Sequence, residues 1–448
     1  MSEPRTQFAT RLGVIATTVG SAVGLGNIWR FPYEAGAHGG GAFLLLDLLF
    51  IFIIGVPVVC AEFIIGRHTG KNIRGAFRAL APGKSWGLVS YVGLTAAIMI
   101  LSFYSVVAGW TMHYTVSSVT EFSGRMSTAA LHDRFDSFAS SDMAVVWTLV
   151  FLTANYLIIS RGVQKGIEKM SNILMPILFI TLLVFTINSL MMPGAIDGVT
   201  FLFKPKFSEI TPAVVLSAMG QAFFSLSLGL GCLITYSSYF KKETPLVRTS
   251  FITAGLDTMV AILAGVIIFP AVFTFGQEPT AGPKLVFEVL PSIFSSISGG
   301  VIWSTLFFFL LFLASITSTI SMAEITTAYF SEEFGLSRKR ATALTIALAM
   351  VFGSLCAMSF GSLGHITIFG MTLFNLFDYV SSNILLPLGG LIISVFVGWV
   401  LDRSIVNSEL THSDRPASRV ITRMVVFCLR WLAPVCIGIV FIFGLGIF

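Results

Sequence analysis

Long apolar segments follow one another along almost the whole chain, and they constrain this protein more than any other feature. Eleven occur, at roughly residues 11–37, 41–66, 87–120, 143–160, 167–191, 211–240, 249–275, 300–330, 341–359, 366–400 and 421–447. A helix that crosses a bilayer needs about 20 mainly apolar residues. The pattern therefore predicts an all-α polytopic membrane protein with eleven transmembrane helices.

The composition supports the same class. Of the 448 residues, 55% are hydrophobic and only 11% are charged, whereas about 25% are charged in a typical soluble domain. This excludes a soluble enzyme, a disordered chain, a collagen-like fibre and a nucleic-acid-binding domain. An outer-membrane barrel is disfavoured because the apolar runs are continuous rather than alternating. The lipid bilayer is the expected partner, and no nucleic-acid partner is expected.

Lysine and arginine are distributed unevenly between the loops. If the N-terminus lies inside, twenty of the 27 Lys and Arg residues fall in inner segments and five in outer loops. Cytoplasmic loops carry such an excess of positive charge. We expect a multi-pass protein of the cell (inner) membrane with a cytoplasmic N-terminus and, after eleven spans, an external C-terminus.

Two apolar segments carry Gly-Leu-Gly near their middle, at Gly24–Gly26 and at Gly229–Gly231. Glycine costs about 1 kcal/mol in a helix interior, and unwound backbone in a membrane is tolerated only beside a cavity. The paired glycines predict an inverted repeat whose first and sixth helices are broken. Close helix packing through these glycines is the alternative. The two repeats would cover residues 11–191 and 211–400, and helix 421–447 would complete a single domain of residues 1–448.

The ends of half-helices present free backbone groups to a bound ligand. N-terminal N–H groups favour an anion such as a carboxylate, and C-terminal carbonyls favour a hard cation such as Na⁺. Near the breaks, Asn27 and Ser225 add side-chain oxygens, and Asp257 is a lone carboxylate in the seventh apolar segment. An ionisable residue inside a membrane segment indicates a functional site.

Other charged residues suggest contacts between helices. Glu62 lies where Gly-rich backbone could donate N–H groups to it. Arg30 and Asp378 could pair on the outer side, and Arg5 with Glu332 on the inner side; surface pairing without a role is the alternative. The histidines show no metal-ligand spacing, and no nucleophile stands with a base, so we expect no enzyme activity.

The runs around the two breaks are long and specific. They comprise residues 24–33 with 38–43, residues 221–229, residues 235–239 and residues 314–318. In order between about residues 5 and 400, they resemble signatures of the neurotransmitter:sodium symporter family, in particular its bacterial eleven-span members. The resemblance implies a five-plus-five inverted-repeat transporter fold and sodium-coupled uptake of a small amine or amino acid by alternating access.

The resemblance implies two sodium sites. The first would be formed by Ala22, Asn27, Ser225 and Asp257 with the substrate carboxylate, and the second by Gly20, Val23, Ala314, Thr317 and Ser318. Asp257 stands where many members have Asn, and Ala261 stands where chloride-dependent members have Ser. A carboxylate beside Na⁺ can supply the negative charge that chloride supplies elsewhere. We expect no chloride requirement, and proton antiport through Asp257 stays open.

The resemblance also implies a substrate pocket. Its residues would be Ala22, Gly26, Ile100, Tyr104, Phe224, Ser225, Ser227, Leu230, Ser318 and Met322. Tyr104 would donate its hydroxyl to the substrate carboxylate, and Phe224 would close the pocket from outside. Members that carry monoamines have Asp where this chain has Gly24, so a substrate with its own carboxylate is favoured. The apolar side chains indicate a hydrophobic amino acid, aromatic or branched.

Gates and a flexible fifth helix follow from the same resemblance. The outer gate would be Arg30 with Asp378, and the inner gate Arg5 with Glu332, supported by Tyr239. In the fifth segment, Gly166 and Pro176 would let the helix unwind and admit water to the second sodium site. Glu62 would support the second helix.

We therefore expect sodium-coupled import of a hydrophobic L-amino acid. The alternative is a membrane amino-acid sensor that binds but does not transport. A gated channel and an intramembrane enzyme are less favoured, because the breaks indicate one occluded site and no nucleophile is evident. The preferred amino acid and the oligomeric state stay open.

Overall fold

The computed structural model describes residues 6–121, 128–276, 286–287, 290–296, 299–411 and 416–445. Within these ranges the chain is helical, and the β-pairing there is one isolated bridge between Ile368 and Met371. In the same ranges, nine helices are long and apolar enough to cross a membrane, or ten if the bent pair at the N-terminus counts as one span. The predicted all-α polytopic class is confirmed, and the count of eleven spans stays a prediction.

The helices of the N-terminal half come first. They are α1 (Arg11–Ala22), η1 (Gly26–Arg30), α2 (Phe31–Ala37), α3 (Gly41–Phe50), η2 (Ile51–Gly55), α4 (Val56–Thr69), α5 (Ile73–Leu80), η3 (Ser85–Leu88), α6 (Val89–Glu121), α7 (Thr128–Ala139), α8 (Asp142–Ile159), η4 (Val163–Glu168), α9 (Lys169–Leu190) and α10 (Ala195–Phe203). Among them, η3 is a 3₁₀-helix and η1, η2 and η4 are π-helical.

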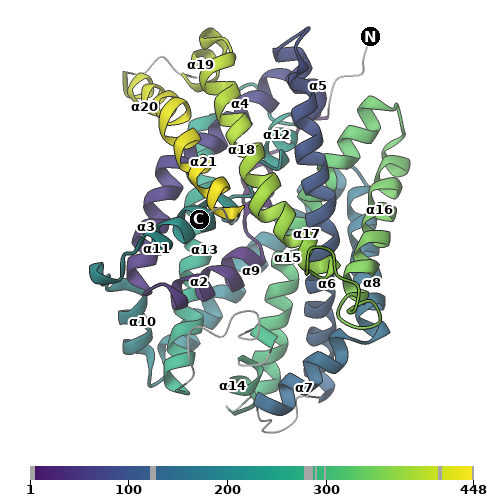
Figure 1. The fold of residues 1–448 in the computed structure, drawn as a ribbon, viewed down its shortest axis with the longest axis vertical. Helices are drawn as coiled ribbons and strands as arrows, with labels where there is room; N and C mark the ends of the chain where they lie inside the picture. The colour runs from purple at the N-terminus through teal and green to yellow at the C-terminus, as the bar shows by residue number, and fades with distance from the viewer. Residues whose placement is uncertain are drawn as a thin grey trace.

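The C-terminal half follows in the same manner. Its helices are η5 (Phe207–Glu209), α11 (Pro212–Ser225), α12 (Cys232–Ser237), α13 (Leu246–Thr274), α14 (Leu290–Ser296), α15 (Gly300–Glu333), α16 (Arg338–Met358), α17 (Leu373–Tyr379), η7 (Val380–Leu385), α18 (Leu386–Val395), η8 (Phe396–Val400), α19 (Arg403–Leu410), α20 (Pro416–Phe427), η9 (Cys428–Leu432) and α21 (Ala433–Gly444). Figure 1 shows α5 and α19 near one end of the molecule and α7 and α14 near the other.

The first apolar segment is interrupted at the glycines that the sequence singled out. The side chain of Thr10 accepts a hydrogen bond from the Gly13 N–H and so caps α1. The helix ends at Ala22, because Val23 adopts an extended conformation. The chain resumes helical structure at Gly26, and the two helical parts differ in direction by 53°.

The sixth apolar segment is interrupted in a similar way. Helix α11 ends at Ser225 and α12 begins at Cys232. Between them, Gly229 (φ 82°) and Gly231 (φ 85°) lie in the left-handed region that favours glycine. A Cβ on Gly229 would stand 2.3 Å from the carbonyl oxygen of Leu386, so this glycine also permits close packing against α18. The break and the close packing are therefore both present at this position.

Helices α4 and α12 approach each other at backbone distance. A Cβ on Gly66 would lie 2.0 Å from the Ile234 carbonyl oxygen, so only glycine fits here. Around the two interruptions, α1 packs against α9, α13 and α15, and α6 packs against α15. These contacts place the interruptions beside α6 and α15 in the interior of the helix bundle.

Candidate functional site

A cavity lies where the two interruptions meet α6, α15 and the start of α18. Its empty volume is about 400 Å³ when the space open to solvent is included. The structure brings together in its lining all ten of the residues that the resemblance assigned to the substrate, namely Ala22, Gly26, Ile100, Tyr104, Phe224, Ser225, Ser227, Leu230, Ser318 and Met322. Gly24 and Leu386 complete the lining. The resemblance did not assign Leu386, which comes from the tenth apolar segment.

Two hydroxyl groups border the first interruption. The Leu25 N–H donates to the Tyr104 hydroxyl at 2.7 Å, and the Ser318 hydroxyl donates to the Val23 carbonyl at 2.8 Å. A Cβ on Gly24 would lie 2.7 Å from both hydroxyl oxygens. Because the Tyr104 oxygen accepts from the backbone, its own hydrogen can be donated to a ligand.

The ring of Phe224 borders the cavity, and the guanidinium of Arg30 lies over this ring. Phe224 is half-buried, and the Arg30 guanidinium stands 4.4 Å from the centre of its ring. Arg30 also lies 3.8 Å from the Glu34 carboxylate, one helical turn further along. Asp378 accepts a hydrogen bond from Ser382 at 2.9 Å. Within the described ranges Arg30 and Asp378 form no ion pair, and their role as an outer gate stays a prediction.

The carboxylate of Asp257 is fully buried and joins the two interruptions. Its Oδ1 accepts from the Asn27 amide at 2.7 Å, and its Oδ2 accepts from the Ser225 hydroxyl at 2.6 Å. The amide oxygen of Asn27 accepts from the Gly24 N–H at 2.9 Å. Three of the four residues predicted for the first sodium site therefore share one hydrogen-bonded cluster, and Ala22 lies in the cavity lining beside it.

The residues predicted for the second sodium site lie between α1 and α15. Ser318 bonds the Val23 carbonyl, and a Cβ on Gly20 would be 3.3 Å from Cβ of Thr317. The Thr317 hydroxyl donates to its own helix, at 3.0 Å from the Ala314 carbonyl. The structure thus brings all five residues to one helix–helix contact that is rich in hydroxyl and carbonyl oxygens.

A buried carboxylate faces the second interruption from α4. Glu62 is fully buried, and its Oε1 accepts from the Gly229 N–H at 2.8 Å. Glu62 also interacts with the backbone N–H groups of Leu233 and Ile234 in the first turn of α12, so the carboxylate faces the positive end of that half-helix. Glu62 therefore fixes the unwound backbone of 226–231 to the second span.

The inner gate is only partly described. Arg5 lies outside the described residues, and Glu332 accepts two hydrogen bonds from Asn72, at 2.8 and 2.9 Å. The Tyr239 hydroxyl donates to Glu324 at 2.6 Å. Glu324 is fully buried on α15 and forms a bidentate ion pair with Arg338 at 2.6 and 2.7 Å. This pair joins α15 to the start of α16, and the sequence analysis did not predict it.

The segment before α1 is held to the rest of the protein. The Glu168 carboxylate accepts from the N–H groups of Ala9 and Thr10, at 2.8 and 3.0 Å, and from the Thr10 hydroxyl at 2.9 Å. The side chain of Phe8 is buried, and its ring meets that of Tyr239 edge-to-face at 5.8 Å. These contacts tie the N-terminal end of α1 to η4 and to the segment after α12.

The fifth apolar segment contains both irregularities that were predicted. Gly166 lies in the π-helical turn η4, and Pro176 lies inside α9. A Cβ on Gly166 would be 2.1 Å from the Ile158 carbonyl oxygen, so glycine is required there by packing. A π-helical turn breaks the regular hydrogen-bond ladder of an α-helix and often marks a functional position.

Some residues of the site carry a signal that the sequence analysis did not use. Asp47 on α3 and Glu324 on α15 are single buried carboxylates in apolar segments, the same signal that singled out Asp257. Asp47 interacts electrostatically with Asp257. Glu168 and Leu386 carry no such local signal, because only the fold brings them to their partners.

The fold and the cavity define a polytopic helical membrane protein that can enclose a small molecule where two of its helices are interrupted. The family model described as "Sodium:neurotransmitter symporter family" matches residues 5–128 and 125–448, and the chain belongs to this family.

Relatives match over nearly the whole chain. An uncharacterized sodium-dependent transporter, YhdH, of Bacillus subtilis (strain 168) is 37% identical over 449 residues, which cover 100% of this chain and 99% of the relative. An uncharacterized sodium-dependent transporter of Haemophilus influenzae is 39% identical over 415 residues, covering 89% and 90%. The crystal structure of MhsT in complex with L-phenylalanine is similar, with a TM-score of 0.90, 43% identity and coverage of 98% and 100%.

Proposed function

We propose that this chain imports a hydrophobic L-amino acid together with sodium ions by alternating access. The observation that carries the proposal is the cavity at the two interruptions, where all ten expected substrate residues meet. At one end of the cavity, a half-helix N-terminus and the Tyr104 hydroxyl favour the carboxylate of a substrate. At the other end, apolar side chains favour a substrate whose own side chain is apolar. Family membership and the sodium-dependent relatives support the same function.

The first sodium ion would bind beside Asp257. Its buried carboxylate is a strong ligand for a hard cation, and Asn27, Ser225 and the Ala22 carbonyl add neutral oxygens. When the cation is bound, the Asn27 amide would turn its oxygen toward it. The carboxylate of the amino acid would complete the ligands, so that each of the two solutes favours the binding of the other.

The second sodium ion would bind between α1 and α15. Backbone carbonyls of Gly20, Val23 and Ala314 and the hydroxyls of Thr317 and Ser318 would be its ligands. All are neutral oxygens from two helices, so the ion would stabilise their contact. Release of this ion toward the inner side would follow when η4 and α9 loosen at Gly166 and Pro176.

The cavity wall supports an aromatic or branched substrate. Ile100, Leu230 and Met322 are apolar and buried, and no charged side chain is among the described residues that line this cavity. Because an unpaired charge or polar group would lose its hydration here, charged amino acids are disfavoured. The similar structure MhsT holds L-phenylalanine, which makes phenylalanine a suitable first substrate to test.

Chloride would not be needed, because the Asp257 carboxylate already supplies negative charge beside the first sodium ion. The protein would lie in the inner membrane with its N-terminus in the cytoplasm, as the charge of the loops indicates. Residues 11–191 and 211–400 would form the inverted repeats. Closure outside would involve Phe224, Arg30 and Asp378, and closure inside Arg5, Glu332 and Tyr239.

Uptake into proteoliposomes tests the proposal. Labelled phenylalanine, leucine and tryptophan would be offered with an inward Na⁺ gradient, and a K⁺ gradient would be the control. Concentrative uptake that requires Na⁺ supports symport, and competition by unlabelled amino acids would rank the substrates. Sodium-dependent binding without accumulation would favour the sensor, and the absence of binding would refute the assignment of the pocket.

A further inference from the structure

A second, larger cavity is lined by residues from the ranges 397–411 and 419–431. These ranges belong to the end of the tenth apolar segment, the helix that follows it, and the eleventh apolar segment. Its empty volume is about 1320 Å³ when the space open to solvent is included, compared with about 400 Å³ by the same measure at the two interruptions. Helix α19, the end of η8, α20 and η9 form its walls. We propose that this cavity binds the phosphate headgroup of an anionic phospholipid.

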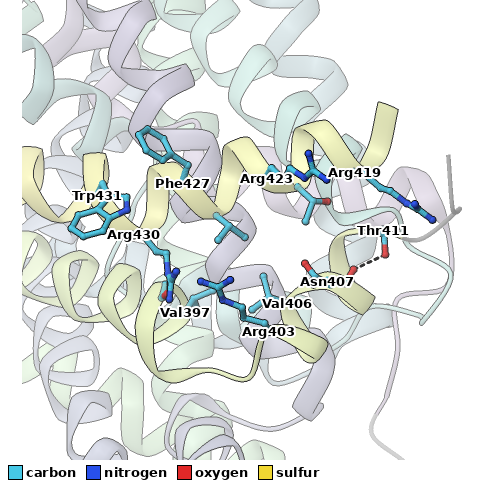
Figure 2. A pocket seen from close by; sticks show the side chains of 13 residues that line it. Val397, Arg403, Val406, Asn407, Thr411, Arg419, Arg423, Phe427, Arg430 and Trp431 are labelled. Carbon is cyan, nitrogen blue, oxygen red and sulfur yellow. Dashed lines mark hydrogen bonds between the residues drawn. The ribbon is translucent and has the colours of Figure 1, made fainter. Parts of the chain in front are cut away.

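The cavity is strongly basic. Arg403, Arg419, Arg423 and Arg430 line it, and no acidic residue is among the described residues of its lining. In Figure 2, Arg403 and Arg430 extend from opposite walls toward the same space. Like charges held this close repel one another unless an anion lies between them. Guanidinium groups bind phosphate through paired hydrogen bonds, which makes arginine the preferred residue for such an anion.

Two of the arginines are available to a ligand. In the part of the chain that the structure describes, Arg403 and Arg423 make neither a hydrogen bond nor an ion pair through their side chains, and both are exposed. Arg430 is held in place, since its Nε donates to the Gly398 carbonyl at 2.6 Å and its guanidinium stacks on Trp399 at 4.8 Å. The site therefore combines one fixed cation with two that can close on a headgroup.

Apolar surface beside the arginines indicates a lipid rather than free phosphate. Phe427 and Trp431 line the same cavity and are 55% and 52% exposed. In the most apolar 18-residue window of the surrounding span, Arg419–Gly444, only 22% is buried inside the protein, which leaves most of that window to face lipid. Trp399 and Trp431 meet edge-to-face at 4.9 Å. Tryptophan favours the depth of lipid headgroups.

The charge pattern places this cavity on the cytoplasmic side, together with the other basic segments. Basic pockets between spans on that side are the places where anionic headgroups bind. In this arrangement the phosphate would lie between Arg403 and Arg423, and the acyl chains would pass along Phe427 and Trp431. The inference does not depend on which solute the central cavity carries.

Native mass spectrometry of the purified, delipidated full-length protein tests the proposal. Dioleoylphosphatidylglycerol and dioleoylphosphatidylcholine would be titrated separately, and the variant would be Arg403→Gln with Arg423→Gln. Each arginine near an anionic headgroup changes binding by about fivefold at low salt, so the double variant should bind the anionic lipid about 30-fold more weakly. Binding of the zwitterionic lipid should be weak and unchanged.

Two controls make the result specific. Arg161→Gln with Lys165→Gln removes the same charge from exposed positions of another basic segment, and it should change lipid binding less than about twofold. If the double variant does not fold, Asn407→Glu, which places a carboxylate in the cavity at an exposed position, should weaken binding instead. An equal loss of lipid binding in the control variant would refute the proposed site. Displacement of the lipid by millimolar inorganic phosphate would show that the site binds free phosphate rather than a lipid.

Discussion

Replacement of Asp257 by Asn tests the chemistry of the first sodium site most directly. The side chain is fully buried, and its two oxygens accept hydrogen bonds from Asn27 at 2.7 Å and from Ser225 at 2.6 Å. An amide presents one acceptor and one donor group. With its oxygen toward Asn27, the new amide can keep that bond and donate its N–H to the Ser225 hydroxyl, but both become hydrogen bonds between neutral groups, and Asp257→Asn loses the negative charge beside the cation.

The expected size of the effect follows from these contacts. A hydrogen bond to a charged group contributes about 1.5–3 kcal/mol, and about 1.4 kcal/mol corresponds to a tenfold change in an equilibrium constant. We expect the Na⁺ concentration for half-maximal uptake to rise by roughly 10-fold to 100-fold in Asp257→Asn. Chloride should then restore part of the uptake, because it can supply the missing negative charge.

The assay is uptake into proteoliposomes with Na⁺ titrated in gluconate and in chloride, at two internal pH values. Asp197→Asn is the matched control, because it makes the same chemical change at an exposed position of α10. The reasoning is refuted if Asp257→Asn keeps the wild-type sodium dependence, chloride independence and response to internal pH. Loss of the pH response alone would point to proton antiport through Asp257.

Three further predictions concern other parts of the site. Gly24→Ala places a Cβ 2.7 Å from the hydroxyls of Tyr104 and Ser318; overpacking of about 1–3 kcal/mol should weaken equilibrium binding of labelled substrate by about 10-fold or more, and unchanged binding would contradict the cavity. Glu168→Ala removes the acceptor of three hydrogen bonds to Ala9 and Thr10. We expect the free energy of unfolding to fall by about 1–2 kcal/mol, measured as a lower melting temperature in detergent. Glu168→Asp should recover part of this stability. Replacement of Na⁺ by K⁺ should lower the melting temperature of the wild-type protein, since ligands stabilise the state that they bind. It should also abolish the stabilisation that substrate provides. An equal melting temperature in both salts would contradict the binding of sodium.

Sequence periodicity and motif together predicted much of the site. The glycine pairs indicated where the helices are interrupted, because glycine in a membrane helix has a cost that needs a reason. The lone carboxylate of Asp257 indicated a polar centre. The ten cavity residues were named through their likeness to family motifs, and their positions on four separate apolar segments could not have been connected by spacing alone.

Contacts between distant segments were harder to predict. Glu324 stands alone in the eighth apolar segment and Arg338 begins the basic run 338–340, but their pairing depends on how α15 and α16 pack. Glu168 binds Thr10, the N-cap residue of α1, from a position 158 residues away. Arg30 was assigned to Asp378, whereas in this structure it lies near Glu34, a partner that the i,i+4 spacing alone suggests.

The backbone contact between α4 and α12 limits how this protein can move. Gly66 lies directly against the Ile234 carbonyl, and Glu62 holds the Gly229 N–H at the start of the same half-helix. Neither contact leaves room for α12 to turn or slide on its own. The two contacts couple α4 both to α12 and to the stretch 226–231, so a conformational change that displaces α12 should carry α4 with it.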